Sequence, residues 1–177
     1  NRLRRQAAKR VRAEDWSAAI TAYRKALRID PSAAFARTGL GRAEERVKLH
    51  GQFDHYLDKP SRLYSAAPLA NAQKLLATAG TAPRDEPQLE KKIVRLRGLV
   101  EVAAKPVRVT LGSDGETSVV IYHVGRLGKF DQHQLDLRPG DYTVVGSRPG
   151  YRDVRKVIRV RPGASLPPVL IRCEEAI

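Results

Sequence analysis

The sequence has few of the residues on which several classes of protein depend. Its 177 residues include one cysteine, Cys173, and no methionine. A single thiol excludes a disulfide framework within the chain and a zinc site made of several cysteines. Because Cys173 lies in a late apolar run, we interpret it as a small packing residue. Because the chain starts at Asn1 and lacks methionine, we expect it to belong to a longer protein, with room upstream for a signal peptide or an anchor.

Long apolar runs and aromatic side chains are also scarce. No stretch approaches the ~18 uncharged apolar residues that a membrane-spanning helix needs. Aromatic residues make up 6% of the chain. The hydrophobic fraction of 42% and the charged fraction of 29% are close to those of soluble globular proteins. A folded chain is therefore expected, and a length of 177 residues is enough for one domain or for two small ones.

Positive charge is in excess, with a formal net charge of +14. Residues 1–50 hold 13 Lys and Arg against 5 Asp and Glu. One run of cations is uninterrupted by any acid and consists of Arg2, Arg4, Arg5, Lys9, Arg10 and Arg12. This run has two interpretations, a solvated helix face or a contact with an anionic surface such as nucleic acid, lipid or an acidic polymer.

The first half has the period of helices. Trp16, Ile20, Tyr23 and Leu27 recur at steps of four, three and four, which places them on one helix face. Asp30-Pro31 then supplies a capping carboxylate and a proline suited to the first helical position. A second helix is therefore predicted to begin directly after the first.

This segment resembles a tetratricopeptide repeat. Ala19, Tyr23, Ala26 and Pro31 match its small, aromatic, small and proline positions, and Leu40-Gly41 match the Leu-Gly pair of the next repeat. The resemblance extends to about residue 45, with departures at Arg10 and Pro60. It implies close helix pairs that bind a protein partner. Because such arrays need about three units, further repeats upstream or packing against other helices are expected.

Two further helices are predicted before residue 105. One begins near Pro68 and runs to Gly80, and its apolar face consists of Leu69, Ala72, Leu75, Leu76 and Ala79. The other begins near Asp85 and Pro87, and its apolar stripe consists of Leu89, Ile93, Leu96, Val100 and Ala103. Residues 78–87 are predicted to be the loop between them, and Lys105-Pro106 to be a domain boundary.

From Pro106 onward the period changes from helical to alternating. Short β-branched or aromatic runs are separated by turn signals, among them Gly125 to Gly128, Pro139-Gly140 and Pro149-Gly150. Five or six strands without room for crossover helices imply antiparallel pairing. The predicted fold class is α+β in two domains: an N-terminal all-α, TPR-like domain over residues 1–104, and a small C-terminal antiparallel β-sandwich over residues 105–177.

The segment LRPGDYTVVGSRPGYRDVRKVIRVRPG, residues 137–163, repeats Pro-Gly around two valine-rich runs. Proline presets φ and glycine tolerates positive φ, so hairpins are predicted on both sides of the strand that contains Tyr142. The pattern resembles PEGA-type and carboxypeptidase-regulatory-like β-sandwich modules. That resemblance implies a non-catalytic adhesive or spacing role in a bacterial envelope protein. We also expect Tyr151 to cap the core.

A second group of cations lies in this segment. Strand alternation predicts that Arg155, Arg159 and Arg161 share one face. That face is either a solvated surface that protects a sheet edge or an anion-binding stripe. The scarcity of aromatic side chains beside these arginines argues against stacking with single-stranded nucleic acid.

The histidines do not form a recognisable chemical motif. His50 and His55 would lie about 140° apart on a helix, and His50-Gly51 is interpreted as a helix end. His123 and His133 have no nucleophile motif beside them. We therefore expect no enzyme activity, no metal site and no cofactor.

The function predicted from these features is a scaffold in the bacterial cell envelope. The helical repeats would bind a protein partner, and the β module would act as a spacer or a docking domain. We expect the protein to lie in the periplasm or cell envelope and to be anchored by a segment upstream of residue 1, and a cytoplasmic location stays open. An anionic envelope polymer or a lipid surface is a further possible partner. The alternative is a binder of an acidic polymer or nucleic acid through the basic surfaces. A third possibility is that both modules are accessories of an upstream hydrolase.

Overall fold

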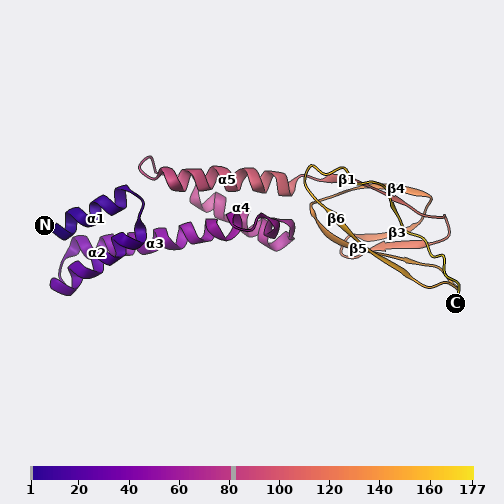
Figure 1. Ribbon diagram of the computed structural model, residues 1–177, viewed down its shortest axis with the longest axis horizontal. Helices are drawn as coiled ribbons and strands as arrows, with labels where there is room; N and C mark the ends of the chain where they lie inside the picture. The colour runs from indigo at the N-terminus through magenta and orange to yellow at the C-terminus, as the bar shows by residue number, and fades with distance from the viewer. Residues whose placement is uncertain (1, 81–82) are drawn as a thin grey trace. The chain divides into compact units, whose positions relative to one another are not determined.

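The chain folds as a run of helices followed by a run of strands (Figure 1). The computed structural model describes residues 2–80 and 83–177. The helices are α1 (Arg2–Arg12), α2 (Trp16–Ile29), α3 (Ala34–Leu57), the 3-10 helix η1 (Pro60–Tyr64), α4 (Ala66–Ala79) and α5 (Pro87–Ala104). The strands are β1 (Val107–Gly112), β2 (Ser118–Ile121), β3 (Gly125–Lys129), β4 (Gln132–Leu137), β5 (Gly140–Ser147), β6 (Val154–Val160) and β7 (Val169–Leu170). The predicted α+β fold class is therefore confirmed.

By its contacts the chain forms two compact units. The helical unit comprises the residues up to Arg62 together with Ala70–Leu99, and the β unit comprises Leu63–Leu69 and Val100–Ile177. The domain boundary at residue 105 stays a prediction. Over the residues that the structure describes, no helix is long and apolar enough to cross a membrane.

The buried face of α2 is made mainly of alanines rather than of the predicted apolar stripe. Trp16 is 4% exposed and Ala19 is fully buried, and both pack with Ala43 of α3. Ile20 and Tyr23 are half-buried and pack against this cluster from its edge. Small side chains therefore let α2 and α3 come close together.

The two helices come into close contact at Gly39 of α3, which faces the ring of Tyr23 on α2. A Cβ atom on Gly39 would lie 2.3 Å from Cζ of Tyr23, so no larger residue fits there without movement. The glycine predicted for the repeat's Leu-Gly pair was Gly41, but Gly41 is exposed and a Cβ there would meet no atom within 4 Å. The glycine that allows close packing is thus two positions earlier than the repeat pattern places it.

The prediction that Asp30-Pro31 begins the next helix is wrong. Asp30 is the C-cap residue of α2, and its carboxylate accepts hydrogen bonds from the main-chain N–H (2.9 Å) and the hydroxyl (2.6 Å) of Ser32. This is an Asx-type turn, in which an aspartate bonds to the chain two residues on. Helix α3 begins only at Ala34, without a side-chain cap.

The helix end predicted at His50-Gly51 is also wrong. Helix α3 continues through both residues to Leu57, a length of 24 residues. Its buried residues are spread along this length, from Ala36 and Ala43 to Phe53. The second repeat therefore does not close into a short helix pair at that point.

The apolar stripe predicted for α5 is confirmed. All five of its positions are buried at 7% exposure or less, namely Leu89, Ile93, Leu96, Val100 and Ala103. Helix α4 ends at Ala79, and Gly80 follows with φ +59°, the left-handed conformation that often closes a helix. The loop predicted over residues 78–87 includes Thr81 and Ala82, which lie outside the described residues.

The first turn of α5 is capped by a residue far away in the sequence. Pro87 takes the first helical position as predicted. The main-chain N–H groups of Gln88 and Leu89 donate to the carboxylate of Glu14, at 2.7 and 3.1 Å. Glu14 is 7% exposed and lies in the left-handed region with φ 52°. The carboxylate satisfies main-chain N–H groups that have no partner within the helix. The positive end of the helix dipole in turn offsets part of the cost of burying its charge.

Two sheets form the β unit. One has the strand order β4-β1-β7 and the other β3-β2-β5-β6. All pairings are antiparallel except the short parallel pairing of β1 with β7. Buried side chains from both sheets form one core cluster, which consists of Val109, Leu111, Val119, Ile121, Leu137, Val144, Ile158, Val160 and Ile171. The core thus lies between two sheets, as in a sandwich.

Two turns of the predicted strand map are wrong. Gly125 to Gly128, expected to be a turn, lies in strand β3, and the turn is at residues 122–124. The predicted hairpin at Pro139-Gly140 is absent among the described strand pairings, because β4 and β5 belong to different sheets and Pro139 lies at the crossing. The hairpin on the other side, between β5 and β6, is present.

The C-terminal segment is bonded to the rest of the β unit at several points. Buried Thr117 accepts a hydrogen bond from the N–H of Cys173 (3.1 Å) and donates one to Asp114 (3.0 Å). Cys173 is 3% exposed, as expected of a packing residue. Tyr151 pairs through its main chain with Ala176, and the guanidinium of Arg148 lies 4.4 Å from its ring.

Candidate functional site

All six predicted cations of α1 are exposed, but they do not form one cluster. At about 100° per residue, one arc of the helix carries Arg2, Arg5, Lys9 and Arg12. Arg10 pairs with Asp15 at 3.0 Å. The guanidinium of Arg4 lies 5.7 Å from the ring centre of Phe35 on α3.

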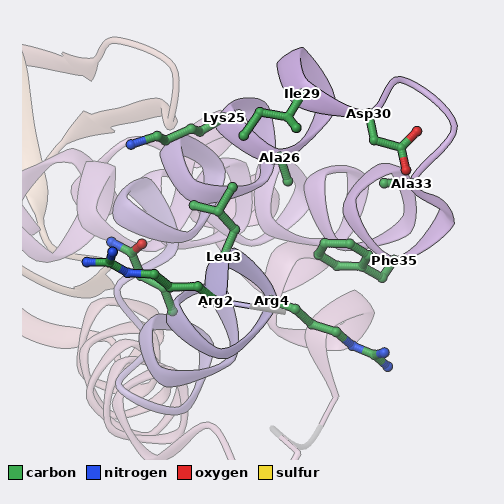
Figure 2. A pocket seen from close by; sticks show the side chains of 10 residues that line it. Arg2, Leu3, Arg4, Lys25, Ala26, Ile29, Asp30, Ala33 and Phe35 are labelled. Carbon is green, nitrogen blue, oxygen red and sulfur yellow. The ribbon is translucent and has the colours of Figure 1, made fainter.

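Arg4 borders a hollow of the helical unit, shown in Figure 2. This groove has a volume of about 660 Å³ and lies where α1, the end of α2 and the start of α3 meet. Its lining consists of Arg2, Leu3, Arg4, Gln6, Lys25, Ala26, Ile29, Asp30, Ala33 and Phe35. We refer to these residues as the groove.

The floor of the groove is apolar. Ala26 is 6% exposed, Leu3 and Phe35 are half-buried, and Ile29 is 72% exposed. Burying a large apolar side chain with that much exposed surface against a partner would stabilise the complex. The groove therefore offers a hydrophobic contact that the described chain leaves open to solvent.

Its edge carries three cations and one acid. Arg2, Arg4 and Lys25 contribute positive charge, and Asp30 contributes negative charge. Hydrogen bonds from Ser32, first from its hydroxyl and then from its N–H, lower the pKa of Asp30. A lowered pKa keeps the Asp30 carboxylate charged, so the edge of the groove carries three positive charges and one negative charge and is positive on balance.

The predicted cations of the β unit are only partly brought together. Arg155 and Arg159 lie exposed on strand β6, with Val157 between them on the same face. Arg161 follows the end of β6 and pairs with Asp141 at 2.8 Å. The predicted stripe of three arginines thus comprises two solvent-facing arginines and one that is tied to an acid.

Of the residues that line the groove, the sequence predicted only Arg2 and Arg4 as site residues. Lys25, Ile29 and Phe35 are among those that it missed. A signal was available in Ile29, an apolar residue just after Arg28 and off the predicted stripe. An apolar residue outside the buried stripe of a helix is a candidate for contact with a partner.

The described residues hold no group of three or more His, Cys, Asp and Glu that could bind a metal ion. His50 and His55 both lie on α3, where His50 is half-buried and His55 is exposed. Neither the family models nor the curated proteins with which the chain was compared match it. The tetratricopeptide and PEGA resemblances therefore stay predictions.

His50 makes the stability of the helical unit depend on pH. Burial lowers its pKa, and nearby Lys92 lowers it further, while Glu14, Asp54 and Glu86 act in the opposite direction. A histidine with a lowered pKa binds fewer protons in the folded state than in the unfolded state. Its contribution is thus fully present above the ordinary histidine pKa of about 6.5 and is lost as the pH falls below it.

We expect urea unfolding, followed by circular dichroism, to show a falling free energy of unfolding between pH 7.5 and pH 5. His50→Gln should flatten part of that decline. His55→Gln, on the exposed face of the same helix, is the matched control and should leave the decline unchanged. Equal profiles for the two variants would contradict the assignment to His50.

Proposed function

We propose that this chain is a non-catalytic interaction module in which the groove of the helical unit binds a protein partner. The observation that carries the proposal is an apolar floor, including the 72% exposed Ile29, edged by three cations. The proposed setting is a bacterial envelope protein on its periplasmic side, where the β unit spaces or docks. Its support is the resemblance of residues 137–163 to modules with that role.

The charges of the groove select an acidic partner segment. Burying an isoleucine or phenylalanine side chain contributes roughly 1.5–3 kcal/mol, whereas an exposed ion pair contributes at most about 1 kcal/mol. Contacts to Ile29 and Phe35 therefore supply most of the affinity, and the cations choose the partner and its orientation. An amphipathic helix with leucines on one side and glutamates beside them fits both requirements.

Fluorescence anisotropy with a labelled Leu/Glu amphipathic peptide tests the proposal. We expect Ile29→Ser to weaken binding at least roughly ten-fold, because ~1.4 kcal/mol of apolar contact corresponds to that factor. Val94→Ser is the matched control, since Val94 on α5 is 56% exposed and lies outside the groove. A Leu/Lys peptide of the same length should bind more weakly. The proposal fails if Ile29→Ser binds like the control, or if the two peptides bind equally.

The second candidate is binding of an acidic polymer or nucleic acid. It is favoured by the exposed arc of Arg2, Arg5, Lys9 and Arg12 on α1. Phosphate contacts predict that affinity for single-stranded DNA falls steeply with salt. Arg5→Glu/Arg12→Glu should then abolish DNA binding, while Ile29→Ser leaves it unchanged. The reverse pattern would favour the protein-binding groove.

A further inference from the structure

The outer face of the four-stranded sheet carries apolar side chains surrounded by cations. In the register of the strands, Val120 of β2 lies beside Arg126 of β3 and Val145 of β5, and Val145 lies beside Arg155 of β6. Arg155, Val157 and Arg159 share this face, since the intervening Ile158 points into the core. We call Val120, Arg126, Val145, Arg155, Val157 and Arg159, together with the β2–β3 turn, the cationic face.

The turn between β2 and β3 exposes large apolar side chains at one end of this face. Tyr122 is 46% and Val124 is 44% exposed, and Val157 nearby on β6 is 59% exposed. The guanidinium of Arg155 lies 5.8 Å from the ring centre of Tyr122. An open hollow of about 530 Å³ follows the turn from Val120 to Arg126. Exposed apolar side chains and a cation thus lie close together at the β2–β3 turn.

Negative charge is almost absent from these strands. Among the residues of β2, β3, β5 and β6 the only acid is Asp141. Its carboxylate is already paired with Arg161 at 2.8 Å. Asp141 also lies opposite Arg159 in the register of β5 and β6, so Arg126 and Arg155 are the cations of the face that this acid leaves available to an external anion.

We infer that the cationic face binds the surface of an anionic lipid bilayer. Apolar side chains at a turn can enter the headgroup region while the adjacent arginines contact lipid phosphates. A single exposed tyrosine does not make a stacking platform for nucleic acid, which needs several aromatic side chains. Four strands about 4.8 Å apart give a face of only a few hundred Å², less than the ~800 Å² per partner of a stable protein interface. A bilayer can contact both the arginines and the protruding turn without a protein interface of that area.

The expected binding is weak and reversible. Each basic residue near an anionic membrane surface strengthens partitioning roughly five-fold. Arg126 and Arg155 with the exposed turn should therefore give an association comparable to that of one myristoyl chain, on the order of 10⁴ M⁻¹. Such binding is measurable at millimolar lipid and does not depend on the groove of the helical unit.

Vesicle co-sedimentation of the full 177-residue chain tests this inference. We expect binding to phosphatidylcholine vesicles that contain one-third phosphatidylglycerol, and little binding to phosphatidylcholine alone. Arg126→Ala/Arg155→Ala should weaken it roughly 25-fold, as expected for two cations. The control, Arg108→Ala/Arg138→Ala, removes the same charge from outside the four strands. A control that loses binding equally, or a wild-type chain that ignores the anionic lipid, overturns the inference.

A second measurement distinguishes insertion from general attraction of a basic protein. Trp16 is buried in the helical unit, so a tryptophan in the turn can be followed separately by difference from the parent chain. In Tyr122→Trp, emission should shift to the blue on the anionic vesicles if the turn enters the headgroup region. An unshifted spectrum, or loss of single-stranded DNA or poly-glutamate binding in Arg126→Ala/Arg155→Ala without loss of vesicle binding, overturns the assignment to lipid.

Discussion

Glu86→Gln is expected to lower the free energy of unfolding by about 2–3 kcal/mol. Glu86 is 1% exposed and immediately precedes α5. Its carboxylate accepts a hydrogen bond from Arg46 Nε at 3.0 Å and another from Arg42 at 3.2 Å, and both arginines lie on α3. A neutral amide would leave these arginines without their counter-charge. The Arg46 side chain is 25% exposed and the Arg42 side chain 51% exposed, so water partly screens both ion pairs. The expected loss in the free energy of unfolding therefore lies at or below the lower end of the range for breaking a buried ion pair.

The neighbouring residue supplies the matched control. Asp85 lies 3.9 Å from Arg42, and its side chain is 70% exposed, so Asp85→Asn should change the free energy of unfolding by less than about 0.5 kcal/mol. Urea titration followed by circular dichroism measures both variants. Similar losses for the two substitutions would show that burial of the Glu86 carboxylate is not what holds the start of α5 to α3.

Gly39→Ala should destabilise the helical unit by about 1–2 kcal/mol, although alanine is the better helix former. The added methyl group would meet the Tyr23 ring at 2.3 Å, and that ring packs against the cluster of Trp16, Ala19 and Ala43. The ring and the helix must therefore move apart. Thermal unfolding of the variant measures the loss.

Gly41→Ala provides the opposite expectation from the same helix. A Cβ on Gly41 would meet no atom within 4 Å, so only helix propensity changes and stability should rise by about 0.5–1 kcal/mol. If Gly41→Ala rather than Gly39→Ala destabilises the helical unit, the close contact between α2 and α3 lies at Gly41, as the repeat pattern predicts.

The periodicity of apolar residues predicted the helices and strands whose buried faces depend on residues close together in the sequence. The five-residue stripe of α5 is buried as expected, because a helix with one apolar face has only one way to shield it. The change to alternation after Pro106 likewise predicted the strands, and β1 begins at Val107. Both features depend on neighbours within a few residues in the sequence.

Features that depend on distant residues were missed. Nothing near Pro87 indicates that Glu14, more than seventy residues earlier, caps α5. Pro139-Gly140 has the composition of a hairpin turn, yet whether the next strand pairs in the same sheet is decided by tertiary packing. The helix cap predicted at Asp30 failed for a local reason instead, because its carboxylate bonds to Ser32, two residues on.

The groove was missed for a related reason. The cations of α1 were visible as a run, but a linear run does not show that Arg4 turns toward Phe35 while Arg10 pairs with Asp15. Lys25 and Ile29 join the groove only because α2 packs beside α1. Sequence therefore predicted the charge of the site, whereas helix packing determined its shape.

The most direct test of the proposed function is an amide ¹H–¹⁵N chemical-shift map of the full chain during titration with the Leu/Glu peptide. We predict that shifts concentrate in α1, the end of α2 and the start of α3, around Leu3, Ile29 and Phe35. Shifts confined to the β strands, or shifts that persist unchanged in Ile29→Ser, would contradict the binding groove.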